Sequence, residues 1–120
     1  NSELKKNIEN FLYAKLPSAF KYHVDQLDNP SFIIYDVPLL FEKHLEQSVD
    51  ITVLVYAPAQ IQLKRLMSRD NCSASVAQSI LDSQDPIDSK KEKSDFIVQN
   101  SKNTSHLTTQ IQSLRAKLFL

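Results

Sequence analysis

Glycine is absent from this sequence of 120 residues. Because glycine makes up roughly 7% of ordinary proteins, a chain of this length normally carries about eight. A Walker A phosphate loop and a dinucleotide-binding GxGxxG turn both need glycine, since their backbone approaches phosphate more closely than a Cβ allows. The chain therefore contains neither motif, and any nucleotide chemistry would depend on residues outside it.

The sequence also has only one cysteine and a net charge of zero. The single cysteine, Cys72, excludes an internal disulfide framework and fits a reducing compartment. The 14 basic side chains balance 14 acidic ones, which argues against a nucleic-acid footprint and a polybasic membrane surface. The longest uncharged run, 51–63, is shorter than the roughly 20 residues of a membrane span, and 1–10 lack the pattern of a targeting signal. We therefore expect a cytoplasmic domain without nucleic-acid or membrane partners.

Helical and strand patterns alternate in the first half of the chain. Apolar residues recur at helical spacing near the N-terminus, at Leu4, Ile8, Phe11, Leu12 and Leu16. Pro17 predicts a break, after which a second helix would run to about Leu27. The continuous apolar run 32–35 is typical of a strand buried on both faces of a parallel sheet, and the spacing of 39–47 predicts another helix.

The second half shows the same alternation more strongly. The run 51–56 is the strongest strand pattern in the sequence, and 96–98 is a shorter one. Helices are predicted over about 58–69, 73–81 and 107–118, the second with Ser73 as its cap. This order predicts an α/β fold in which 32–35, 51–56 and 96–98 form one parallel sheet. Three strands are few for such a sheet, so we expect the C-terminal portion of a longer domain.

A block directly after the first predicted strand carries the most specific signal. It reads Asp-Val-Pro-Leu-Leu-Phe-Glu over 36–42 and resembles the signature of dephospho-CoA kinase, the P-loop kinase that completes coenzyme A biosynthesis. The resemblance continues in the family's order through Val49-Asp50, Val55 to Pro58, Gln62 to Asp70, Gln84, Pro86, Lys90, Asp95 to Val98 and Asn100-Ser101. It thus covers about 31–101, whereas Tyr13-Ala14 stands where the family commonly has a His-Pro pair.

The resemblance implies a P-loop NTPase-like three-layer fold with a parallel sheet, here without its N-terminal strand and Walker A loop. It implies a single partial kinase domain (1–120) with four parts: a helical substrate-side segment (1–30), core strands with the 36–42 block (31–57), a lid-like helical region (58–94), and the last strand and helix (95–120).

The resemblance also implies a reaction, the transfer of the ATP γ-phosphoryl group to the ribose 3′-hydroxyl of dephospho-CoA, with Mg²⁺ bridging the phosphates. The phosphate cradle, the Mg²⁺ ligands and the base would come from a preceding segment. We therefore expect the chain alone to be inactive.

The resemblance assigns four residues of the first block to the dephospho-CoA pocket: Asp36, Pro38, Leu39 and Leu40. Asp36 follows a predicted central strand, and ligands of open α/β sheets bind at the carboxyl ends of the strands. The alternative is that Asp36 only ends the strand and caps the helix that begins near Leu39.

Two arginines in the lid-like region are candidates for stabilising the transferred phosphoryl group. Arg65 and Arg69 are four residues apart and share a helix face. A guanidinium fork matches phosphate oxygens and remains charged at every working pH. We expect Arg69 to matter more, because it borders the Asp70-Asn71 break. The alternative for both is a solvated helix face.

Two further residues are candidates for binding the nucleotide. Lys90 follows Gln84 and Pro86 at the family spacing and could steer phosphate, although lysine clusters are usually solvated. Asn100 follows the last predicted strand, where its amide could both donate to and accept from the adenine ring, and a turn asparagine is the alternative. The three histidines lack ligand spacing, so no metal site is predicted within the chain.

Two other functions stay open. A different small-molecule P-loop kinase would share the fold, although the 36–42 block argues against it. A non-catalytic binding or assembly module with a degenerate kinase fold is favoured by the missing glycine. In either case an exposed sheet edge would allow self-association.

Overall fold

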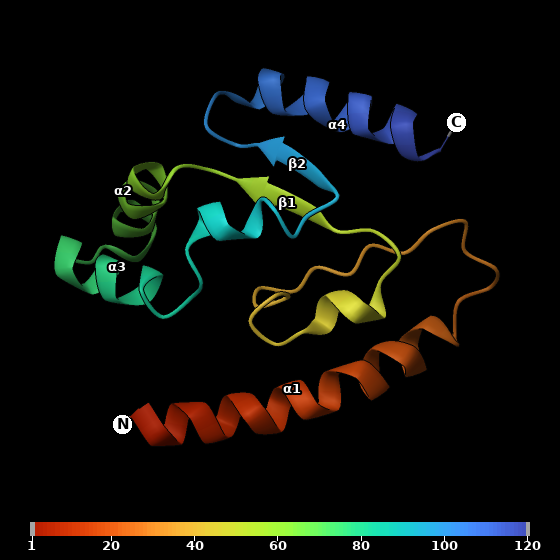
Figure 1. The fold of residues 1–120 in the computed structure, drawn as a ribbon, viewed down its shortest axis with the longest axis horizontal. Coiled ribbons are helices and arrows are strands. Elements are labelled where there is room, and N and C mark those ends of the chain that lie inside the picture. Colours follow the sequence, from red (N-terminus) through yellow and green to blue (C-terminus); the bar gives the residue numbers. More distant parts are fainter. Residues whose placement is uncertain (1, 120) are drawn as a thin grey trace. The chain divides into compact units, whose positions relative to one another are not determined.

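The structure, a computed structural model, describes residues 2–119 as helices and two short strands (Figure 1). The elements in chain order are α1 (Ser2–Val24), the 3-10 helix η1 (Leu45–Ser48), β1 (Val53–Tyr56), α2 (Ala59–Asp70), α3 (Ala74–Leu81), the 3-10 helix η2 (Ile87–Lys90), β2 (Phe96–Gln99) and α4 (Thr104–Leu118). The chain forms two compact units, Asn1–Lys43 and His44–Leu120. The first unit contains α1, and the second contains the sheet and the other helices.

The first helix, α1, passes through Pro17 without ending there. The predicted break is therefore wrong. A proline removes its own N–H donor and strains the preceding turn, but the helix can bend and continue where both flanking turns are formed. Directly after the proline, the Ser18 hydroxyl donates to the Lys15 carbonyl at 3.0 Å. The helix ends at Val24, before the predicted end near Leu27.

The apolar run 32–35 is irregular chain and not a strand. In the part of the chain that the structure describes, the sheet consists of β1 and β2, so the predicted third parallel strand is wrong. An apolar, β-branched run forms a strand only where a neighbour accepts its backbone hydrogen bonds. Ile34 is 82% exposed, whereas the Tyr35 ring stacks on Phe20 of α1 with centroids 4.0 Å apart. The run therefore packs on a helix through one of its aromatic residues.

The predicted helix over 39–47 is also wrong over most of its length. Residues 38–44 form turns, with one helical hydrogen bond from the Lys43 N–H to the Leu39 carbonyl at 3.1 Å. His44 then adopts a left-handed φ of 53°, which interrupts a right-handed helix. Only the 3-10 helix η1 follows.

The two strands β1 and β2 pair in parallel, with Tyr56 opposite Gln99. Backbone hydrogen bonds extend the pairing beyond both ends of β1. At the amino end, the Phe96 N–H donates to the Thr52 carbonyl at 3.1 Å, and at the carboxyl end the Asn100 N–H donates to the Tyr56 carbonyl at 2.7 Å. The predicted α/β fold class with a parallel sheet is confirmed.

The core of the second unit lies around this sheet. Both strands fall within or beside the predicted runs 51–56 and 96–98, which are confirmed as strands. Burial alternates along β1, where Leu54 and Tyr56 are buried, and Val98 of β2 is only 2% exposed. The apolar side chains of the strands thus provide the main packing surface for the surrounding helices.

Asp95 and Thr52 close the amino end of the sheet. The carboxylate oxygen Oδ2 of Asp95 accepts from the Thr52 N–H at 2.8 Å and from the Thr52 hydroxyl at 2.7 Å. The Asp95 N–H donates in return to Thr52 Oγ1 at 3.1 Å. The backbone donor and then the hydroxyl donor of Thr52 hold the pKa of the Asp95 carboxyl below its usual range.

The helices of the second unit pack in two places, with α2 against α3 and α4 along β2 (Figure 1). The predicted Ser73 cap is confirmed, because its hydroxyl accepts from the Val76 N–H at 3.4 Å. On α4, the Gln110 amide donates to the Gln99 carbonyl and accepts from the Gln99 N–H, both at 2.8 Å. The Gln110 side chain therefore forms the two hydrogen bonds that a neighbouring strand would form with the backbone of Gln99.

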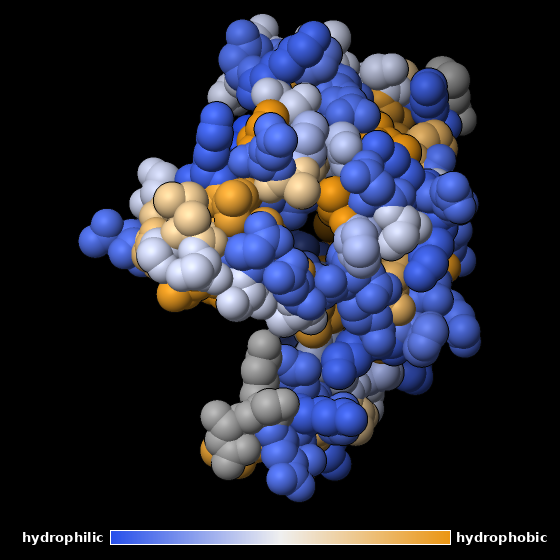
Figure 2. All heavy atoms as spheres, turned by 60° about the vertical axis from the view of Figure 1, so that its left-hand side comes forward, coloured by the Kyte–Doolittle hydropathy of each residue, from blue (hydrophilic) through white to orange (hydrophobic). Residues whose placement is uncertain are grey.

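The molecular face in Figure 2 is mostly hydrophilic, with apolar side chains in separate patches. Among the residues from 2 to 119, none of the helices combines the length and the apolar character that crossing a membrane requires.

Candidate active site

The carboxyl ends of β1 and β2 meet at one edge of the sheet. Tyr56 ends β1, and Asn100 directly follows β2 and donates its N–H to the Tyr56 carbonyl. In open α/β sheets this edge is the one where ligands bind. Asn100 is half-buried there, so the structure places this predicted nucleotide contact at the expected edge.

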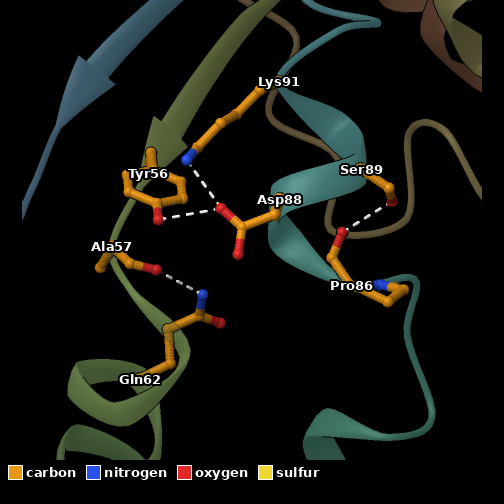
Figure 3. A network of polar contacts seen from close by, with 7 residues as sticks. All are labelled: Tyr56, Ala57, Gln62, Pro86, Asp88, Ser89 and Lys91. Atoms are coloured by element: carbon orange, nitrogen blue, oxygen red, sulfur yellow. Dashed lines mark hydrogen bonds and ion pairs between the residues drawn. The ribbon is translucent and has the colours of Figure 1, made fainter.

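The two candidate arginines lie on α2, which begins close to the same edge. The Gln62 amide donates to the Ala57 carbonyl at 2.7 Å and fixes the first turn of α2 to the end of β1 (Figure 3). Arg65 and Arg69 follow on this helix, and both are exposed. The helix ends in the left-handed Asn71 at φ 48°, which confirms the predicted break.

Arg69 is paired with its neighbour Asp70. The guanidinium donates from Nε to Asp70 Oδ1 at 2.6 Å and from Nη2 to Asp70 Oδ2 at 2.9 Å. These hydrogen bonds raise the pKa of Arg69 and lower the pKa of Asp70. Both side chains are solvated, so water or a phosphate can replace this pair at little cost.

Lys90 is the last residue of η2 and is only 6% exposed. The sequence pattern made a solvated lysine the ordinary expectation, and the structure corrects it. Lysine is rarely this buried unless its ammonium is satisfied by polar groups. The hydroxyl of Ser94 donates to the Lys90 carbonyl at 2.8 Å and thereby closes the turn after η2.

A cluster of three side chains beside this edge was not foreseen from the sequence. The Tyr56 hydroxyl donates to Asp88 Oδ1 at 3.0 Å, and Lys91 Nζ lies 2.7 Å from the same oxygen (Figure 3). Lys91 Nζ also lies 3.9 Å from the centroid of the Tyr56 ring.

The electrostatics of the cluster follow from these contacts. The donor on Lys91 and then the Tyr56 hydroxyl lower the pKa of Asp88. The Asp88 carboxylate and then Tyr56 raise the pKa of Lys91. The spacing of Asp88 and Lys91, three residues apart on a turn, was the one sequence signal for the pair.

The dephospho-CoA candidates lie in the first unit, apart in the chain from the nucleotide-side candidates. Asp36 and Pro38 are exposed, and Leu39 and Leu40 are half-buried. All four belong to one stretch of irregular chain and turns after 32–35. The structure thus gathers these candidates in one segment of one unit, while Arg65, Arg69, Lys90 and Asn100 belong to the other unit.

Tyr13, which stands at the family's His-Pro position, has a polar environment within the first unit. Lys43 Nζ lies 5.2 Å from the centroid of its ring and 3.7 Å from Glu9 Oε2. Burial raises the pKa of Tyr13, and the charges of Glu9, Glu42 and Tyr35 add to this effect. The helix α1 therefore contacts the residue that directly follows the 36–42 block.

The described residues give no basis for a metal site. No group of three or more histidine, cysteine, aspartate or glutamate side chains between 2 and 119 could hold a metal ion.

Comparison with protein-family models identifies a related family. The family model described as dephospho-CoA kinase matches residues 1–106. Among curated relatives, the dephospho-CoA kinase of Campylobacter jejuni (strain RM1221) is 36% identical over 103 residues, which cover 84% of this chain and 51% of that protein. The enzyme of Listeria monocytogenes (strain EGD-e) is 38% identical over 79 residues, which cover 66% of this chain and 40% of that protein.

Solved structures agree in fold. A crystal structure from Thermus thermophilus superposes with a TM-score of 0.81 at 22% identity, over 100% of this chain and 62% of that one. A dephospho-CoA kinase structure from Campylobacter jejuni gives a TM-score of 0.58 at 32% identity, over 98% of this chain and 61% of that one. The chain spans about half the length of the curated relatives it matches.

Proposed function

This chain belongs to the dephospho-CoA kinase family, and from this premise we propose that it serves the transfer of the ATP γ-phosphoryl group to the ribose 3′-hydroxyl of dephospho-CoA, in the cytoplasm. The observation that carries the proposal is the family match over residues 1–106, which includes the ordered blocks from Asp36 to Ser101. We also propose that the kinase domain has four parts: a substrate-side segment (1–30), core strands (31–57), a lid-like region (58–94), and the last strand and helix (95–120).

Arg65 and Arg69 are proposed to stabilise the charge on the transferred phosphoryl group. Phosphoryl transfer depends mainly on positioning and charge neutralisation, and an arginine fork supplies both. Arg69 is the stronger candidate because it lies next to the end of α2 and already binds a carboxylate in bidentate form. In the reaction, the phosphate oxygens would replace the Asp70 carboxylate on this guanidinium.

Asn100 and Lys90 are proposed for the nucleotide. Asn100 lies at the ligand-binding edge of the sheet, where its side-chain amide can both donate to and accept from adenine. The burial of Lys90 supports a specific electrostatic role more than a solvated surface role. Its charge would attract the phosphates when they bind.

Asp36, Pro38, Leu39 and Leu40 are proposed to form the wall of the dephospho-CoA pocket. The exposed Asp36 carboxylate can accept hydrogen bonds from a substrate hydroxyl, and the half-buried leucines offer an apolar surface. The Tyr13 side chain belongs to the same unit, and the helix that carries it is proposed as the substrate-side segment.

Mg²⁺ is proposed to accompany ATP, with its ligands outside the residues that the structure describes. The described part contains no suitable group of ligands, and the sequence contains no glycine for a phosphate loop. We therefore assign neither a Mg²⁺ ligand nor a phosphate cradle to these residues. Residues 1–120 by themselves should release no ADP above background with Mg-ATP and dephospho-CoA.

The test is an ADP-release assay on the complete product of the gene that encodes this chain. Arg69→Ala should lower kcat by about 30- to 1000-fold, as the loss of one preorganised donor to a developing charge does. Arg69→Lys should restore the rate only in part, because a point charge lacks the bidentate fork. Lys64→Ala, on the same helix, is the matched control and should change little. Equal rates for the wild type and Arg69→Ala would mean that Arg69 is a solvated surface residue with no part in phosphoryl transfer.

A second function is favoured by one observation, the missing glycine. A non-catalytic binding module with the same fold would bind ATP or dephospho-CoA without turnover. Binding by calorimetry together with no ADP release from the complete gene product would support the module and exclude the kinase. ADP release with another small-molecule acceptor but not with dephospho-CoA would instead indicate a different kinase.

Self-association through β1 is proposed as a further property. In the described sheet β1 is an edge strand, and Val53 and Val55 on it are exposed, the latter by 57%. No charged residue occurs between Asp50 and Lys64 to discourage pairing. Light scattering after size exclusion should show dimers that Val55→Lys converts to monomers. Monomers in the wild type at all concentrations would exclude the proposal.

A further inference from the structure

Tyr56 contacts two segments that carry nucleotide-side candidates. Its backbone carbonyl accepts from the Asn100 N–H at 2.7 Å. Its side-chain hydroxyl donates to Asp88 Oδ1 at 3.0 Å, and Asp88 belongs to η2, whose last residue is Lys90 (Figure 3). The backbone of the buried Tyr56 therefore holds the backbone of Asn100, and its side chain holds the turn that contains Lys90.

The side-chain contacts around Tyr56 form a closed triangle. Asp88 Oδ1 accepts from the Tyr56 hydroxyl and from Lys91 Nζ, and Lys91 Nζ lies over the Tyr56 ring at 3.9 Å in a cation–π contact. Each of the three side chains thus contacts the other two. Because Asp88 and Lys91 flank Lys90 in the chain, the triangle fixes the backbone on both sides of Lys90.

The segment around η2 has little apolar packing of its own. Between 82 and 95 only Lys90 is buried, and Asp88 is exposed. Polar contacts therefore set the position of the turn. Because water can replace a donor to an exposed carboxylate, loss of one such contact displaces the turn without unfolding the protein.

We propose that Tyr56 is a positioning residue for the nucleotide side of the site, which holds Asn100 through its carbonyl and the Lys90 turn through its hydroxyl. The inference rests on the proposed kinase function. Tyr56 acts through the two candidates that it fixes.

The first test is Tyr56→Phe in the complete gene product. The phenyl ring keeps the packing and the cation–π contact, so only the hydroxyl contact is lost. We expect the KM for ATP to rise by about 2- to 10-fold, the range for one hydrogen bond, with the KM for dephospho-CoA unchanged. Equal KM values for ATP in the wild type and the variant would overturn the proposal.

Ser89→Ala is the matched control within the same turn. The Ser89 hydroxyl donates to the Pro86 carbonyl at 2.7 Å and has no contact with Tyr56 in this network (Figure 3). This variant loses one hydroxyl contact from η2, so it should leave both KM values unchanged. A rise in the KM for ATP equal to that of Tyr56→Phe would mean that any loosening of the turn has this effect, and the role of Tyr56 would be refuted.

Hydrogen exchange measures the anchoring without turnover. The N–H groups of Ser89 and Lys91 donate within the turn, to the carbonyls of Pro86 and Asp88. In Tyr56→Phe they should exchange about 2- to 10-fold faster, whereas exchange in β2 should not change. A wild-type protein that releases no ADP would refute the proposed function alone, because the exchange result still tests the anchor. Unchanged exchange in an active enzyme would refute the anchor alone.

Discussion

The two ends of the β1–β2 pair are held together in different ways. At the amino end, Thr52 and Asp95, which lie next to the strands themselves, bind each other through both backbone and side-chain groups. At the carboxyl end, the Tyr56 side chain is held by Asp88 and Lys91 from a separate turn. The amino end is thus closed by residues that adjoin the strands, whereas the carboxyl end also depends on a turn from elsewhere in the chain. In an open α/β sheet the carboxyl end is the one where ligands bind.

The largest effect on stability is expected at the amino end. Thr52→Val keeps the shape of a buried side chain but removes the hydroxyl that donates to the Asp95 carboxylate and accepts from the Asp95 N–H. The free energy of unfolding should fall by about 2 kcal/mol, because one substitution removes two hydrogen bonds of a buried hydroxyl, one of them to a charged carboxylate. Urea unfolding measures this fall. Thr108→Val on the exposed face of α4 is the control, and an equal loss there would show that the amino-end contacts contribute nothing specific.

A smaller effect is expected at the carboxyl end. Tyr56→Phe removes one hydroxyl contact, and its acceptor on Asp88 is exposed and can bind water instead. The free energy of unfolding should fall by about 1 kcal/mol or less. Tyr22→Phe, at an exposed position of α1, provides the reference. If Tyr56→Phe cost more than Thr52→Val, the ranking of the two ends would be reversed.

Acid and alkali should distinguish the two ends. The lowered pKa values of Asp95 and Asp88 mean that both carboxylates stabilise the fold above their unfolded pKa of about 3.9, and that this contribution disappears as the pH falls through the folded values. The pKa of Lys91 is raised, so its contribution is complete below about 10.4 and disappears as the pH rises through the folded value. Acid therefore weakens both ends, and alkali weakens the carboxyl end.

The measurement is the urea midpoint as a function of pH for the wild type and Lys91→Met. The methionine keeps the side-chain stem but cannot titrate, so the part of the alkaline decline that comes from Lys91 should vanish while the decline due to Asp95 in acid remains. An alkaline decline of the same size in both proteins would assign it to other groups.

The smallest effect is expected away from both ends, at Asp70. Its pair with Arg69 is solvated and lies at the end of α2. Asp70→Asn should leave the urea midpoint unchanged within error, because exposed ion pairs contribute little to stability. A clear loss of stability would mean that the pair fixes the end of α2 and is not easily replaced by phosphate.

The sequence predicted the second unit better than the first. The runs 51–56 and 96–98 became strands, and the Ser73 cap formed, because their apolar patterns and capping residues act locally and find partners nearby. The run 32–35 has the same kind of composition but no strand beside it in the described sheet. Composition indicates that a segment can form a strand, whereas pairing depends on residues elsewhere.

The candidate site was predicted in part for a similar reason. The family resemblance is confirmed, and Asn100 lies at the expected edge, because strand direction determines which residues reach it. The burial of Lys90 could not be foreseen, since a run of lysines usually lies in solvent. The contact between Tyr56 and Asp88 spans 32 positions and has no local pattern that would predict it.

The Gln110 amide has a consequence for how copies of this protein could assemble. It occupies the N–H and carbonyl groups that Gln99 would otherwise present to a further strand, so β2 is a poor template for sheet growth at that residue. Gln110 therefore disfavours the addition of a strand at the carboxyl end of β2.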